Sequence, residues 1–105
     1  MIRPELVQKA ARLWEEHLDA EFPVNLRGVE FEDIDMVLLD TFTAGCAYTW
    51  INNDGALDPG RRRILQTSVE DLDRVIPRIS DPSGRKYYQR LHQLALLISR
   101  PPDAE

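Results

Sequence analysis

The sequence predicts an all-α fold, a compact antiparallel four-helix bundle in which the second helix is mostly buried. Three observations favour this architecture. Three stretches carry apolar residues at helical spacing. A fourth, residues 36–51, contains one charged residue, Asp40, in a chain that is 30% charged. Asp-Pro pairs, which are typical of helix starts, precede two of the stretches. With 105 residues the chain has the size of a single domain.

The first helix is expected at about residues 4–21. Pro4 suits the first helical turn, where its missing N–H is not needed, and the helix should end before Pro23. His17 falls in the middle of the apolar arc, which is formed by Leu6, Ala10, Leu13, Trp14 and Leu18.

Residues 22–33 are expected to form a connection. Its apolar and acidic residues alternate, as in a short strand, but no partner strand is recognisable elsewhere in the sequence. We therefore expect a loop, held to the core by Phe22, Leu26, Val29 and Phe31. Asp33 is the expected N-cap of the following helix.

The second helix is expected at about residues 33–53 and is apolar most of the way round. The narrow strip that suits water comprises Asp40, Thr43 and Ala47. Gly45 weakens a helix interior, so we expect another helix to pack closely against it. Gly55 or Asn53 should take the left-handed conformation that closes the helix.

The last two helices are expected at about residues 59–77 and 82–99. Asp58 and Asp81 each precede a proline and should act as N-caps. Pro77 should end or kink the third helix. The apolar stripe of the fourth comprises Tyr87, Tyr88, Leu91, Leu94, Ala95 and Ile98.

Composition favours a cytoplasmic protein. The formal net charge of −5 disfavours binding to nucleic acid. No apolar run approaches the length of a membrane span, and the first residues lack the pattern of a secretory signal. The single cysteine, Cys46, cannot form an internal disulfide.

Metal and cofactor motifs are not found, and we expect neither a metal nor a cofactor. A di-iron bundle needs Glu three residues before His, where this chain has Trp14 and Gln89. A calcium loop centred on Gly55 would begin with Trp50 and end with Arg61, which are not oxygen ligands. No catalytic signature is present, so the sequence favours a non-catalytic protein.

A small-ligand pocket could form from His17, Asp40, Tyr48 and Trp50, and such a pocket could support catalysis. The ordinary explanation for His17 is a core histidine with one hydrogen-bond partner.

The run Arg61–Arg63 places three cations in the first turn of a helix, where they oppose the helix dipole. Two explanations remain open. The arginines could bind an anion together with the helix N-terminus. Alternatively, acidic residues within the fold could neutralise them, and the candidates are Glu30, Glu32 and Asp35.

Leu96 and Leu97 depart from the apolar stripe of the last helix. They could pack under the 22–33 connection, or they could form an exposed patch and a homodimer interface.

Leu39-Asp40-Thr41, Ala44-Gly45-Cys46 and Thr49-Trp50, followed by an arginine-rich third helix, resemble small uncharacterised helical proteins of actinobacteria. The resemblance implies no activity. Together these features predict a non-catalytic protein that binds another protein or itself. The alternative is a domain that binds a small ligand or an anion, either near His17 or at Arg61–Arg63.

Overall fold

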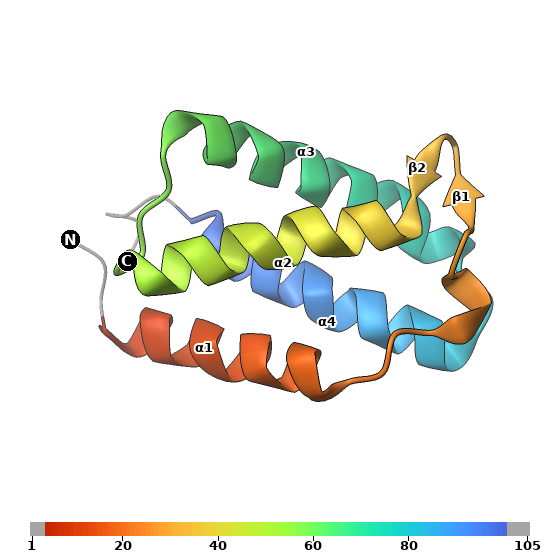
Figure 1. Cartoon of the computed structure of the whole chain (residues 1–105), viewed down its shortest axis with the longest axis horizontal. Coiled ribbons are helices and arrows are strands. Elements are labelled where there is room, and N and C mark those ends of the chain that lie inside the picture. Colours follow the sequence, from red (N-terminus) through yellow and green to blue (C-terminus); the bar gives the residue numbers. More distant parts are fainter. Residues whose placement is uncertain (1–3, 101–105) are drawn as a thin grey trace.

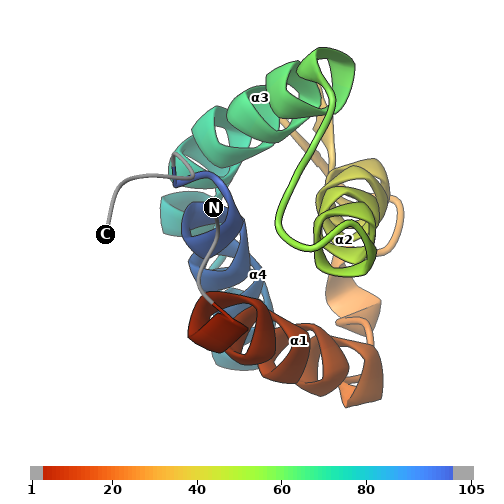
Figure 2. The ribbon, with the colours of Figure 1, turned by 90° about the vertical axis from the view of Figure 1, so that its left-hand side faces the viewer.

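A computed structural model describes residues 4–100 and confirms the all-α bundle. Successive helices run in opposite directions (Figure 1). Seen from one end, α4 lies between α1 and α3, and α2 lies on the opposite side of the bundle (Figure 2). Within residues 4–100, no helix is long and apolar enough to cross a bilayer. The helices are α1 (Pro4–Asp19), α2 (Met36–Asn52), α3 (Pro59–Val75) and α4 (Pro82–Ile98).

The expected caps of α3 and α4 are confirmed. Asp58 Oδ1 accepts a hydrogen bond from the Arg61 amide at 2.8 Å, and Asp81 Oδ2 accepts one from the Gly84 amide at 2.8 Å. Each aspartate thereby satisfies one of the free amides of a first helical turn. Pro77 acts as expected, because α3 ends at Val75 and residues 76–78 form a 3₁₀ turn.

Two strands precede α2, which corrects the expectation of a loop without a partner strand. β1 (Glu30–Phe31) pairs with β2 (Ile34–Asp35) through a two-residue turn, Glu32-Asp33. Both turn residues have positive φ, 52° and 68°, as in a type I′ hairpin turn. Such turns usually contain Asn-Gly or Asp-Gly, so this one has no strong sequence signal. The N-cap is Asp35, not Asp33, because Asp35 Oδ1 accepts from the Leu38 amide at 3.0 Å.

Burial of α2 is less complete than the sequence indicated. Thr43 and Ala47, which were expected to face water, are fully buried, so that expectation is wrong. The Thr43 hydroxyl donates to the Leu39 carbonyl at 2.6 Å, which satisfies it inside the core. The outer face of α2 instead exposes Leu38 and Phe42. α4 is the most deeply buried helix, with Gly84, Tyr87, Tyr88, Leu91, Leu94, Ala95, Leu97 and Ile98 in the core.

The end of α2 matches the expectation in part. Gly55 has φ +88°, and its amide donates to the Trp50 carbonyl at 2.7 Å. Asp54 also has positive φ, whereas Asn53 does not. Gly55 therefore closes the helix, as expected of the residue type that enters the left-handed region most readily.

Gly45 is exposed, and no heavy atom lies within 4 Å of where its Cβ would be, so the expected close packing is wrong. We predict that Gly45→Ala raises the free energy of unfolding by up to about 1 kcal/mol, because alanine restricts the unfolded chain and fits an unobstructed helix. Urea unfolding followed by circular dichroism would measure this. A loss of stability at concentrations where the chain is monomeric would contradict the helical geometry assigned to this position.

Candidate functional site

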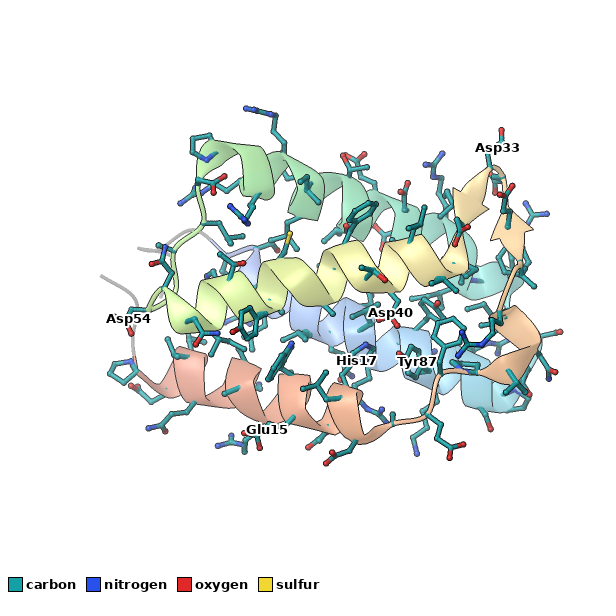
Figure 3. The ribbon with its side chains drawn as sticks, in the orientation of Figure 1. Glu15, His17, Asp33, Asp40, Asp54 and Tyr87 are labelled. Carbon is teal, nitrogen blue, oxygen red and sulfur yellow. The ribbon has the colours of Figure 1, made fainter. Side chains whose placement is uncertain are left out.

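Three polar side chains from three helices meet in the core. His17 of α1 and Asp40 of α2 are joined by a 2.6 Å contact between Nε2 and Oδ1. The Tyr87 hydroxyl of α4 donates to Asp40 Oδ2 at 2.6 Å (Figure 3). An ionised carboxylate only accepts hydrogen bonds, so the proton between His17 and Asp40 is assigned to Nε2. These three residues, the core cluster, link α1, α2 and α4.

The core cluster is closed to solvent on the histidine side. His17 is 4% exposed, and the Asp40 side chain is 16% exposed. Both Asp40 oxygens already accept short hydrogen bonds, whereas His17 Nδ1 has no partner among residues 4–100. Neither residue lines the four hollows described below. The geometry therefore suits a polar link between helices, as expected of a core histidine. The sequence indicated one hydrogen-bond partner for His17, whereas His17 belongs to a network of three residues.

The sequence did not indicate Tyr87 as part of this cluster, because its position fits the apolar stripe of α4. One signal was available: a buried tyrosine normally needs a partner for its hydroxyl. The adjacent Tyr88 obeys the same rule and donates to the Met36 carbonyl at 2.6 Å. Burial, reinforced by the Asp40 carboxylate, raises the pKa of both tyrosines above the ordinary value of 10.

These raised pKa values predict that the protein loses stability in alkali. Below pH 10 both tyrosines are protonated in folded and unfolded chains, and the stabilisation is fully present. As pH rises above 10, only the unfolded chain releases these protons, so the free energy of unfolding falls. Urea unfolding at several pH values should show this decline. Tyr88→Phe should reduce its slope by at most about 1.4 kcal/mol per pH unit, and an unchanged slope would contradict the assignment.

Tyr48 and Trp50 do not join His17 and Asp40 in one pocket. Tyr48 lies eight residues beyond Asp40 on α2, about 12 Å along the helix. Its ring packs against Trp14, with the ring centroids 5.5 Å apart. Trp50 is buried and lines a separate small hollow of about 70 Å³. Its other lining residues are Gly55, Leu57, Arg62, Leu65, Gln66, Ile98, Ser99 and Arg100.

The three arginines at the start of α3 diverge. Arg61 forms an ion pair with Asp58 at 2.6 Å, and Arg62 Nε donates to the Leu57 carbonyl at 3.3 Å. Arg63 lines the groove between α2 and α3. Within residues 4–100 the acidic run forms no ion pair with these arginines, and Glu32 instead binds Arg78 at 2.9 Å. Thus the three side chains have different surroundings, and the binding of an anion by all of them stays a prediction.

Cys46 is buried in the interface between α2 and α3. Its thiol donates to the Arg61 carbonyl, with sulfur and oxygen 3.7 Å apart. Burial raises the pKa of this thiol, which disfavours the reactive thiolate. Within residues 4–100, no three His, Cys, Asp or Glu side chains gather in an arrangement that could hold a metal ion.

Leu96 and Leu97 have different environments. Leu97 is 5% exposed and belongs to the core, whereas Leu96 is 45% exposed. Leu96 borders a hollow between α1 and α4 that also includes Lys9, Leu13, Gln93 and Arg100. The 22–33 connection does not cover this pair, because its Leu26 lies beside Gly84, at the other end of α4.

Another hollow of the surface is lined by Ala20, Glu21, Pro23, Ser83, Lys86, Tyr87 and Arg90.

An apolar groove of about 500 Å³ runs between α2 and α3, and we call it the α2–α3 groove. Its apolar side chains Leu38, Phe42 and Ile64 are 49%, 53% and 44% exposed. The sequence did not indicate this surface, because α2 reads as apolar on nearly every side. The complete lining is Asp33, Ile34, Asp35, Leu38, Leu39, Phe42, Gly60, Arg63, Ile64, Thr67, Ser68 and Asp71.

The charges of the α2–α3 groove are unequally distributed along its length. Asp33 and Asp35 belong to the hairpin and the start of α2, and Asp33 stands at the hairpin tip (Figure 3). Because α3 runs antiparallel to α2, Asp71 lies toward the same end and Arg63 toward the other. The groove is therefore acidic at one end, apolar in the middle and basic at the other end.

Comparison with known proteins found no matching family model, no matching curated protein and no matching solved structure. The resemblance to small actinobacterial helical proteins accordingly stays a prediction.

Proposed function

We propose that this chain is a non-catalytic interaction protein and that the α2–α3 groove is its docking surface. The observation that carries the proposal is the contiguous exposure of Leu38, Phe42 and Ile64 across two packed helices. Half-exposed apolar side chains scattered singly over a surface need no explanation, but a groove that gathers several is typical of a protein-binding site. Fully covering a large apolar side chain is worth about 1.5–3 kcal/mol, so even partial covering of three favours association.

The flanking residues support a protein partner more than a nucleic acid. The groove carries the carboxylates of Asp33, Asp35 and Asp71 against the single cation of Arg63. Phosphate backbones are bound by clusters of Lys and Arg, and this surface has the opposite balance. Charged residues that surround an apolar centre are the usual arrangement of a protein interface.

The alternative function, binding of a small ligand or an anion, has weaker support. At the core cluster, Asp40 is engaged by His17 and Tyr87 through both of its oxygens. At the start of α3, the guanidinium groups of Arg61 and Arg62 are engaged with different partners. Of the core cluster only Tyr87 lines one of the four hollows, and Arg62 and Arg63 line different ones, whereas ligand sites are concave and have convergent polar groups.

Site-specific photocrosslinking tests the proposed docking surface. Phe42 is replaced by the photoreactive residue benzoylphenylalanine in the full chain, which is then irradiated in cells that express it. We expect a defined protein adduct, because the side chain would lie inside an interface. The matched control carries the same replacement at Leu18, an apolar residue of α1 that is 57% exposed and lies outside the groove.

A groove substitution provides the second control. Ile64→Asp in the chain labelled at position 42 should abolish the adduct, since it places a charge in the apolar centre of the groove. Equal adduct yields from positions 42 and 18, or an adduct that survives Ile64→Asp, would contradict the docking surface. Mass spectrometry of the adduct identifies the partner.

A further inference from the structure

We infer that the occupant of the α2–α3 groove is a second copy of this chain, docked about a two-fold axis that crosses α2 and α3. The inference rests on the proposed docking surface and adds the identity of the partner. A two-fold interface requires that one surface be complementary to itself, so that residue i faces residue j and j faces i. The groove meets this requirement in two respects, through its charged residues and through its apolar residues.

The two charges of α3 that line the groove have opposite signs and lie at equal distances from Thr67. Arg63 and Asp71 lie four residues before and four residues after Thr67, and all three line the groove. In an α-helix, positions spaced by four residues share one face. A two-fold axis perpendicular to α3 at the level of Thr67 therefore places Arg63 of each copy opposite Asp71 of the other. Thr67 is exposed, as a contact at the axis requires.

The apolar residues of α2 are symmetric about the same level. The contact between Cys46 Sγ and the Arg61 carbonyl fixes the antiparallel register of α2 and α3. Position 40 lies six residues before Cys46 on α2, and position 67 lies six residues after Arg61 on α3. Because the helices are antiparallel, the two positions lie at the same height along the bundle. Position 40 is also the midpoint between Leu38 and Phe42. The axis that pairs the charges thus places Phe42 of one copy against Leu38 of the other.

The ion pairs within one chain leave Arg63 and Asp71 available for this pairing. Within residues 4–100, Arg63 has no carboxylate at ion-pair distance. The Asp71 carboxylate accepts from Arg74 through Oδ1 at 2.6 Å, and a carboxylate can accept further donors. On the outer face of α2, Gly45 presents no side chain, which gives the hairpin of the second copy room to approach. Two ion pairs and two Phe–Leu contacts would then form in each dimer.

Charge reversal gives a direct test by sedimentation velocity of the full chain. The wild-type chain should form a dimer that weakens as salt concentration rises. Arg63→Glu and Asp71→Arg should each raise the dimer dissociation constant at least ten-fold, because each variant sets two pairs of like charges face to face. An equimolar mixture of the two variants should dimerise again, since every pair that crosses the axis is then of opposite charge. A chain that carries both substitutions should also dimerise.

Matched controls separate this result from damage to the fold. Arg12→Glu, a charge reversal on the exposed face of α1, should leave dimerisation unchanged. Circular dichroism should show the same helix content in every variant. For a variant that fails this check, Phe42→Gln replaces it, and it should also raise the dissociation constant at least ten-fold.

Three outcomes would overturn the inference. They are a wild-type chain that stays monomeric at all concentrations, a dimer that is indifferent to Arg63→Glu and Asp71→Arg, and a mixture of these variants that does not reassociate. A crosslink from position 42 to a different protein, together with a monomeric chain, would overturn the second-copy partner but preserve the docking surface. The absence of any specific crosslink, together with monomeric sedimentation, would overturn both.

Discussion

Replacing Asp40 with alanine is expected to lower the free energy of unfolding by about 3 kcal/mol. Asp40 accepts from His17 Nε2 and from the Tyr87 hydroxyl, both at 2.6 Å. Hydrogen bonds to an ionised acceptor are the stronger kind, and removing the carboxylate leaves His17 Nε2 and the Tyr87 hydroxyl only their mutual 3.3 Å contact. Replacing two short hydrogen bonds by one long contact is costly because His17 and Tyr87 are buried. A native domain has only about 5–15 kcal/mol in total, so the change is large.

Urea unfolding of Asp40→Ala would measure this loss. Glu15→Ala is the matched control, because Glu15 is an exposed carboxylate of α1 that points away from the bundle (Figure 3), and it should change stability by less than about 0.5 kcal/mol. A double-mutant cycle with Tyr87→Phe should give a coupling energy of about 1–3 kcal/mol. Equal effects of Asp40→Ala and Glu15→Ala would show that the core cluster does not link the helices.

Leu97→Ala is expected to cost about 3 kcal/mol, and Leu96→Ala, one residue away, less than about 1 kcal/mol. The two residues share type, helix and sequence context but differ in exposure, 5% against 45%. Truncating Leu97 removes apolar contacts and leaves a cavity, because the surrounding core relaxes only in part to fill it. Truncating Leu96 removes atoms that already touch water. Thermal or urea unfolding of the two variants, measured side by side, checks the difference.

The same pair tests where an interface can lie. A loss of stability with Leu96→Ala as large as that with Leu97→Ala, and dependent on protein concentration, would place a self-association surface on α4. That result would argue against the α2–α3 groove as the dimer interface. Equal losses at every concentration would instead contradict the different exposures of Leu96 and Leu97 in the monomer.

Local chemistry explains which elements were predictable. Asp58 and Asp81 cap α3 and α4 because an aspartate before Pro satisfies the first free amides within three residues, independently of the rest of the fold. Pro77 ends α3 for an equally local reason. The hairpin escaped prediction because Glu32 and Asp33 adopt positive φ without the glycine that usually marks such a turn.

The orientation of α2 was not predictable from its own residues. A helix that is apolar on most sides has no single preferred inner face, so its neighbours decide which residues are covered. Thr43 became acceptable in the core because its hydroxyl bonds to the Leu39 carbonyl within the same helix. With Thr43 on the buried face of α2, Leu38 and Phe42 lie on the outer face and line the groove.

The sequence by itself determined the helical class, the approximate extent of four helices and most of their caps, because periodicity and capping act over a few neighbouring residues. Only the tertiary structure decided that His17, Asp40 and Tyr87 meet, that the arginines of residues 61–63 separate, and that an apolar groove lies between α2 and α3. The physical reason is range, because the core cluster and the α2–α3 groove each join helices that are distant in sequence. Their relative rotation is set by the packing of the whole core.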